Sequence, residues 1–97
     1  MAKKYKLRQT AIHDLRNIGR YTLKHHGKVQ RDKYLNGLEK RFELLSSNPN
    51  FGRPRDDIKP GYRCSEYGKH VVFYRVPRGA TEIIAILHES MVPERNL

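Results

Sequence analysis

Two stretches in the second half of the sequence are apolar at consecutive positions instead of alternate ones. They are "HVVFYRV" at residues 70–76 and "TEIIAIL" at residues 81–87. Successive side chains of a β-strand point to opposite faces, so these strands must bury both faces of their sheet. Strict alternation places Ile83, Ala85 and Leu87 on one face of the second stretch, and Ile84 and Ile86 on the other. Whatever fold this chain adopts has to cover both sides of this sheet.

The segments around these two strands predict a small antiparallel sheet. "YRCSEY" at residues 62–67 is typical of a third strand, and short turns at residues 68–69 and 77–80 join the three into a meander. "KKYKLR" at residues 3–8 alternates between apolar and basic residues, which predicts a short, half-buried strand. Its inner face would carry Tyr5 and Leu7, and its outer face Lys4, Lys6 and Arg8.

Between the first strand and the meander, apolar residues recur with helical spacing. One stripe consists of Ala11, Leu15, Ile18 and Thr22, and a second of Tyr34, Leu38, Phe42 and Leu45. We expect Thr10 to cap the first helix, with Asp14 in its early turns. Gly27 should end that helix and Pro49 should stop the second one. The short link predicts an antiparallel helical hairpin.

These elements predict an α+β fold in one domain over residues 1–97: an N-terminal strand and a helical hairpin packed on a small antiparallel sheet. The hairpin can cover one face of the sheet. We therefore expect the other face to be left open as an interaction surface, so that the free chain associates or binds a partner. On this expectation, Ile84 or Ile86 would contact that partner.

The composition restricts the classes of protein to which the chain can belong. The net charge is +10, and residues 1–48 carry 12 Lys and Arg against 4 Asp and Glu. Such a field favours an acidic partner, either nucleic acid or protein. No apolar run is long enough to cross a membrane, and no signal peptide is present, so we expect no membrane association. The single Cys64 excludes an internal disulfide and suits a reducing cytoplasm.

The sequence shows no arrangement that predicts a cofactor or a metal. Its five histidines lack metal-ligand spacing, and its glycines form no phosphate-binding loop. Asp56 and Asp57 are predicted to be turn residues, and Cys64 a small core residue. His88 ends the last strand, where it is either a locally hydrogen-bonded residue or part of a site.

A basic set surrounds the loop before the meander and the central strands. Its members are Arg53, Arg55, Arg63, Lys69 and Arg75. Arginine binds phosphate and carboxylate groups equally well, so these residues fit either an RNA or an acidic protein surface.

The order of these motifs resembles the RelE/ParE superfamily of bacterial toxins along nearly the whole chain. The motifs are Ala11-x-x-Asp14-Leu15-x-x-Ile18-x-x-Tyr21, Gly27, the stripe Tyr34, Leu38 and Phe42, then "NPNFGRPRDD", Arg63, "VVFYRV" and "IIAILHESM". RelE-like members cleave mRNA on the ribosome, and commonly use an aromatic residue after the last strand. The tail "HESMVPERNL" has no Tyr or Phe, so the chain is more similar to the ParE branch, whose members inhibit DNA gyrase without being nucleases.

The resemblance implies a non-enzymatic, cytoplasmic bacterial toxin of a type II toxin–antitoxin system. It implies a ParD-like antitoxin, with a ribbon-helix-helix domain, that forms a heterotetramer or larger complex and alone contacts operator DNA. The expected partner-binding residues are Arg53, Arg55, Arg63, Arg75, Ile84, Ile86 and His88. Two alternatives remain: a ribosome-dependent mRNA endoribonuclease, for which Arg63 and His88 would be catalytic, and a non-toxic basic binding domain.

Overall fold

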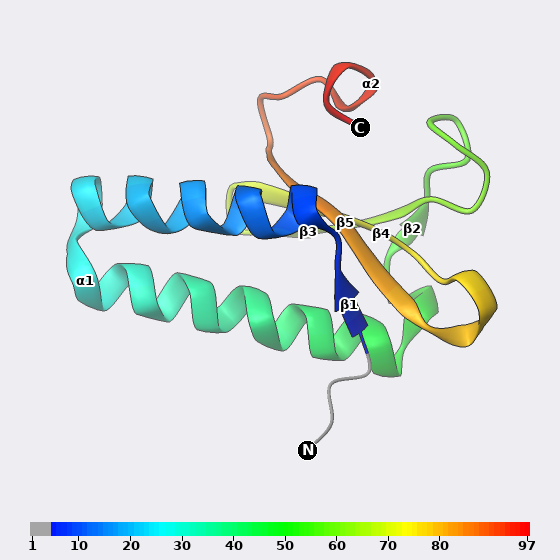
Figure 1. Ribbon diagram of the computed structural model, residues 1–97, viewed down its shortest axis with the longest axis horizontal. Coiled ribbons are helices and arrows are strands. Elements are labelled where there is room, and N and C mark those ends of the chain that lie inside the picture. Colours follow the sequence, from blue (N-terminus) through cyan, green and yellow to red (C-terminus); the bar gives the residue numbers. More distant parts are fainter. Residues whose placement is uncertain (1–4) are drawn as a thin grey trace.

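The computed structural model describes residues 5–97 (Figure 1). Its elements in chain order are β1 (Tyr5–Leu7), α1 (Gln9–Ser47), η1 (Pro49–Phe51), β2 (Arg53–Pro54), β3 (Arg63–Tyr67), β4 (His70–Arg75), η2 (Pro77–Gly79), β5 (Thr81–His88) and α2 (Pro93–Asn96). The α+β class, the first strand and the meander are therefore confirmed. Lys4, expected on the outer face of the first strand, lies outside the described residues.

Helix α1 is folded back on itself at Gly27. A straight α-helix of its 39 residues would be about 58 Å long at 1.5 Å per residue, yet the longest extent of the molecule is 38 Å. Gly27 has φ 85° and ψ 172°, a backbone conformation that is open almost only to glycine. Figure 1 shows the resulting two antiparallel arms, residues 9–26 and 28–47, which confirm the predicted hairpin.

The sheet has five strands in the order β1-β5-β4-β3-β2. Strands β3, β4 and β5 form the predicted antiparallel meander, and β2 adds a short antiparallel edge strand that the sequence analysis missed. Strand β1 pairs in parallel with β5, with Tyr5 opposite Thr81 and Leu7 opposite Ile83. The sheet is therefore mixed, with one parallel pair of strands and three antiparallel pairs. The helical hairpin is the long connection that the parallel strand β1 requires.

The hairpin covers one face of the sheet with the residues of its predicted stripes. Leu38, Phe42 and Leu45 are fully buried in a cluster that includes residues of β4 and β5. Phe42 also makes an edge-to-face contact with Tyr5 of β1, with ring centroids 5.6 Å apart. Burial of each such side chain contributes about 1.5–3 kcal/mol, so this layer is the main apolar core of the chain.

Strand β5 contains a bulge that changes which of its residues share a face. Phe73 pairs with Ala85, whereas its neighbour Tyr74 pairs with Ile83, so Ile84 is the extra residue. Ile83 and Ile86 both pack toward the hairpin, and Ile84, Ala85 and Leu87 pack on the opposite side. The predicted strict alternation of Ile83, Ala85 and Leu87 is wrong, because one inserted residue reverses the facing of all that follow.

The second face of the sheet is also covered, by the chain itself. Tyr62, with the partly buried Ile58 and Leu97, packs against Phe73, Ile84 and Leu87. Only 2% of Ile84 and 3% of Ile86 is exposed. The expectation of an open second face is therefore wrong, because Ile84 is covered there and Ile86 packs toward the hairpin. The loop at residues 55–62 and the C-terminal segment provide the cover that the hairpin does not.

Thr10 does not cap α1, in contrast to our prediction. The helix begins at Gln9 with Arg8 as its capping residue, which makes no side-chain hydrogen bond to the helix. Instead, the Thr10 hydroxyl donates a hydrogen bond of 2.5 Å to the carbonyl of Ile84, the bulged residue. Thr10 therefore stabilises the edge of β5 beyond the point where β1 ends.

The conformation of Gly27 leads to a direct test of the hairpin. Gly27→Ala should lower the free energy of unfolding by about 1–3 kcal/mol, because an L-residue is strained in this conformation. Chemical denaturation of the free chain measures the change. Gly19→Ala is the control, because Gly19 lies inside the first arm and an added Cβ would meet only a Leu35 methyl at 3.4 Å. Equal stability of the two variants would contradict this explanation of the turn.

Candidate functional site

Three of the arginines expected to bind a partner are paired with carboxylates of this chain. The pairs are Arg53 with Glu66, Arg55 with Asp57, and Arg75 with Glu82. The Arg55 pair is bidentate, with both contacts at 3.0 Å, and the hydrogen bond from Arg75 holds the pKa of Glu82 below its usual range. The same loop uses Asp56 to accept the Gly61 backbone N–H, so both aspartates are turn residues as predicted.

Arg63 contacts the backbone of the turn that follows the hairpin. Its Nη2 donates to the carbonyl oxygen of Gly52 at 2.6 Å, while its buried Nε has no partner. Gly52 has no room for a side chain, since a Cβ there would lie 2.5 Å from both the Cys64 carbonyl and the Tyr74 hydroxyl. In the free chain, Arg63 therefore holds the turn against the sheet.

The structure does not bring Arg63 and His88 together. Arg63 pairs with Tyr74 near one end of β4, and His88 pairs with His70 at the other end. Four residues of a strand span about 13 Å at 3.3 Å per residue. The endoribonuclease alternative required Arg63 and His88 to form one acid–base set around a single reacting atom. Their separation in the sheet does not allow this arrangement.

A groove of about 620 Å³ lies between the first arm of the hairpin and the end of β5. Its apolar lining includes Ile18, Ile86, Tyr21 and Met91, and its polar lining includes Asp14, His26, Lys69, His70 and His88. Tyr21 is 61% exposed and Met91 is 47% exposed, so both offer apolar surface to solvent. Of the predicted partner-binding residues, only Ile86 and His88 line this groove.

One wall of the groove is a cluster of aromatic and histidine side chains. The Tyr34 hydroxyl donates to the Tyr67 carbonyl at 3.1 Å and lies 2.6 Å from His70 Nδ1. The His70 ring packs edge-to-face on His88, with centroids 5.5 Å apart. Burial, followed by the proximity of His88, lowers the pKa of His70. His88 Nδ1 contacts Ser90 at the end of the strand, which is the local bonding considered in the sequence analysis.

Asp14 forms the opposite wall and completes the edge of β5. Its carboxylate accepts the Ile86 backbone N–H at 2.9 Å. Burial raises the pKa of this carboxyl, although the hydrogen bond from Ile86 opposes the change. Together with Thr10, Asp14 bonds the part of β5 that extends beyond β1.

Four residues that shape the groove were absent from the predicted site: Asp14, Tyr21, Tyr34 and Met91. Tyr34 was assigned to the apolar stripe of the second helix. A buried tyrosine hydroxyl needs a hydrogen-bond partner, so its presence in a core stripe was an available signal for a polar cluster. For Met91, which follows the last strand, we find no such signal.

Within residues 5–97, no cluster of His, Cys, Asp and Glu is suitable for a metal ion. None of the helices described there has the length and apolar content needed to span a membrane.

Comparison with known proteins assigns the chain to a family. Residues 5–93 match the family model described as "ParE toxin of type II toxin-antitoxin system, parDE". The chain is a member of the ParE toxin family. Toxin ParE1 of Mycobacterium tuberculosis is 36% identical to it over 98 residues, with 100% of both chains covered. Toxin ParE1 of Caulobacter vibrioides is 38% identical over 89 residues, which is 92% of each.

A solved structure supports the fold of this ParE-family toxin. The structure "Chromosomal ParDE TA system from P. aeruginosa" aligns with a TM-score of 0.74 and 22% identity, and covers 87% of this chain and 92% of the other. The chain is therefore the toxin component of a type II toxin–antitoxin system, as the sequence resemblance indicated.

The partly buried His70 of the groove predicts a pH dependence of stability. Because the pKa of His70 in the folded chain lies below its usual value of 6.5, the unfolded chain binds the proton more readily. The free energy of unfolding should therefore fall as the pH decreases from about 7 through this lowered pKa. Denaturation curves between pH 7.5 and pH 5 measure the effect.

His70→Gln should reduce this dependence, since glutamine does not titrate. His13→Gln is the matched control, because it removes a histidine that lies exposed on α1 and does not line the groove. If the His70→Gln profile ran parallel to that of the parent chain, His70 would not be the responsible group.

Proposed function

We propose that this ParE-family toxin inhibits DNA gyrase in the bacterial cytoplasm by binding, with no catalytic step of its own. We further propose that a ParD-like antitoxin neutralises it by occupying the groove between α1 and the end of β5. On this proposal, the antitoxin carries the ribbon-helix-helix domain that reads operator DNA, and the complex is a heterotetramer or larger.

Family membership carries the first part of this proposal, and the geometry of the site supports it. Inhibition by binding requires no assembled set of acid and base groups, and Arg63 of β3 and His88 of β5 lie beside opposite ends of β4. Arg63 binds the turn at residues 50–52, and His88 contacts Ser90. Both side chains therefore have structural partners that account for their positions.

The groove has the properties expected of a site for a flexible, acidic protein segment. Tyr21 and Met91 expose apolar surface to which aliphatic side chains of a partner can dock. Lys69 at its edge can bind partner carboxylates. Since the second face of the sheet is already covered, this groove replaces Ile84 as the surface on which we expect the antitoxin to bind.

The gyrase proposal predicts a specific phenotype. Expression of the toxin without antitoxin should produce filamentous cells and a DNA-damage response, and the purified toxin should inhibit supercoiling or trap cleaved DNA in a gyrase assay. A parallel translation assay should show intact mRNA. Rapid mRNA cleavage with normal gyrase activity would overturn the proposal in favour of an endoribonuclease.

His88→Ala distinguishes a structural residue from a catalytic one. We expect this variant to keep its toxicity, because the contacts of the His88 ring, with Ser90 and with His70 on β4, are structural ones within the chain. Loss of a general acid or base would instead cost about 100-fold or more in rate. Toxicity is scored by colony formation after induction, with circular dichroism to verify the fold. A well-folded, non-toxic variant of a parent chain that itself cleaves mRNA would contradict the non-enzymatic proposal.

The groove assignment predicts which substitutions weaken antitoxin binding. Tyr21→Asp and Met91→Asp should each raise the Kd for the antitoxin by about 10-fold or more, equivalent to about 1.4 kcal/mol, because each replaces exposed apolar contact area with a charge. Val29→Asp is the control, since Val29 is 84% exposed but lies outside the groove. Isothermal titration with the antitoxin encoded beside the toxin measures all three. Equal effects for all three variants would exclude the groove as the binding site.

A further inference from the structure

The first arm of α1 carries a row of basic side chains on the face directed away from the sheet. Arg16, Arg20 and Lys24 are spaced four residues apart, so they advance by about 40° around the helix at each step and remain on one side. Buried residues of this arm, among them Ala11, Ile18 and Thr22, lie on the opposite side. All three basic residues are exposed. We call Arg16, Arg20 and Lys24 the basic row.

No carboxylate of the described chain neutralises the basic row. The ion pairs within residues 5–97 involve other arginines, at positions 8, 31, 53, 55 and 75. Asp14 is the only acidic residue in the first arm, and its carboxylate accepts the Ile86 N–H. The second arm differs, because its exposed lysines alternate with Asp32, Glu39 and Glu43.

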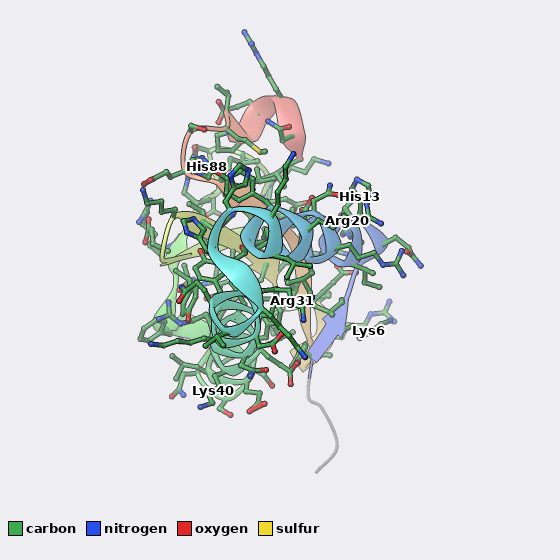
Figure 2. All side chains as sticks on the ribbon, turned by 90° about the vertical axis from the view of Figure 1, so that its left-hand side faces the viewer. Lys6, His13, Arg20, Arg31, Lys40 and His88 are labelled. Atoms are coloured by element: carbon green, nitrogen blue, oxygen red, sulfur yellow. The ribbon has the colours of Figure 1, made fainter. Side chains whose placement is uncertain are left out.

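Lys6 of β1 adds a further positive charge on the same side of the molecule (Figure 2). Figure 2 shows His13 and Arg20 on the first arm on the same side as Lys6 of β1, away from His88 in the groove. None of the three residues of the basic row lines the groove. A ligand on this side would therefore leave the groove accessible.

We propose that the basic row is a contact surface for the phosphate backbone of duplex DNA. The row lies on the convex surface of a helix and its three members end in charged groups, whereas protein interfaces depend on anchors buried in well-packed pockets. Exposed Arg and Lys suffice, however, for phosphate contacts that do not depend on sequence. Along the helix, neighbouring members lie about 6 Å apart, which allows each to bind a separate phosphate.

This inference does not rest on gyrase as the target, since it concerns DNA binding by the toxin alone. It is tested with the full chain and a fluorescent 25-base-pair duplex of arbitrary sequence, by anisotropy between 50 and 200 mM salt. Three phosphate contacts should lower the binding constant about 40-fold over this range. The variant Arg16→Gln/Arg20→Gln/Lys24→Gln should lose this part of the salt dependence, a decrease of about three in the slope of log K against log salt.

The control removes the same number of charges from the second arm, with Lys28→Gln/Lys33→Gln/Lys40→Gln. It should bind the duplex nearly as the parent chain does. Equal losses in the two triple variants would show that the overall field, not the basic row, attracts DNA, and no binding by the parent chain at 50 mM salt would also overturn the proposal. A poly-glutamate peptide provides a further test. If it bound as tightly as the duplex and lost affinity to the same extent in the basic-row variant, the row would be a binding surface for acidic protein and the proposal would be overturned. Thermal melting verifies that both variants are folded.

Discussion

Strand β5 is buried on both faces and hydrogen-bonded along both edges. The rest of the fold supplies the apolar cover and the hydrogen-bond partners that this strand needs. Strand β4 bonds one edge. The other edge is bonded in turn by β1, by the Thr10 hydroxyl and by the Asp14 carboxylate. A buried backbone group without a partner costs about 1–3 kcal/mol. Beyond the end of β1, side chains from the first turns of α1 therefore supply the hydrogen bonds to β5. The bulge at Ile84 is stable because the hydroxyl of Thr10 binds its carbonyl.

The arginines around the central strands help to keep the second face of β5 covered. The second face of the sheet needs a cover that the hairpin cannot supply, and the loop at residues 55–62 provides it through Ile58 and Tyr62. The bidentate pair of Arg55 with Asp57 holds this loop locally, and Arg63 anchors the preceding turn. These charges are thus largely used within the chain, whereas Arg16, Arg20 and Lys24 of the first arm of α1 form no ion pair within residues 5–97.

Apart from the short β2 and α2, the sequence was sufficient to predict the order of the helices and strands, because their signals are local. Gly27 marks the hairpin turn, and the short turns at residues 68–69 and 77–80 determine the meander. The parallel pairing of β1 and the bulge in β5 depend on contacts between distant residues, and no periodicity records them. For the same reason the open second face was a wrong prediction: Ile58 and Leu97 cover it from segments that contain too few apolar residues to form a recognisable pattern.

The candidate site was predicted less well than the fold. His88 was singled out, but Asp14 and Tyr34 reach the groove only because the hairpin brings the first arm and the start of the second beside the sheet. The arginines were noted correctly as a group, yet their carboxylate partners Glu66 and Glu82 come from other strands. Residue type alone therefore indicated affinity for anions without indicating which anions belong to the chain itself.

The parallel contact between β1 and β5 has a consequence for the synthesis of the toxin. Tyr5 pairs with Thr81, which follows it by 76 positions, and both residues are buried in the finished molecule. Such a non-local contact forms only after the intervening chain has been made, and topologies rich in these contacts fold slowly. A nascent chain that ends within the hairpin or before β5 lacks the central strand around which both apolar layers assemble. The sheet can thus assemble only after β5 has been synthesised, so a toxin whose translation stops before Thr81 has no central strand on which to fold.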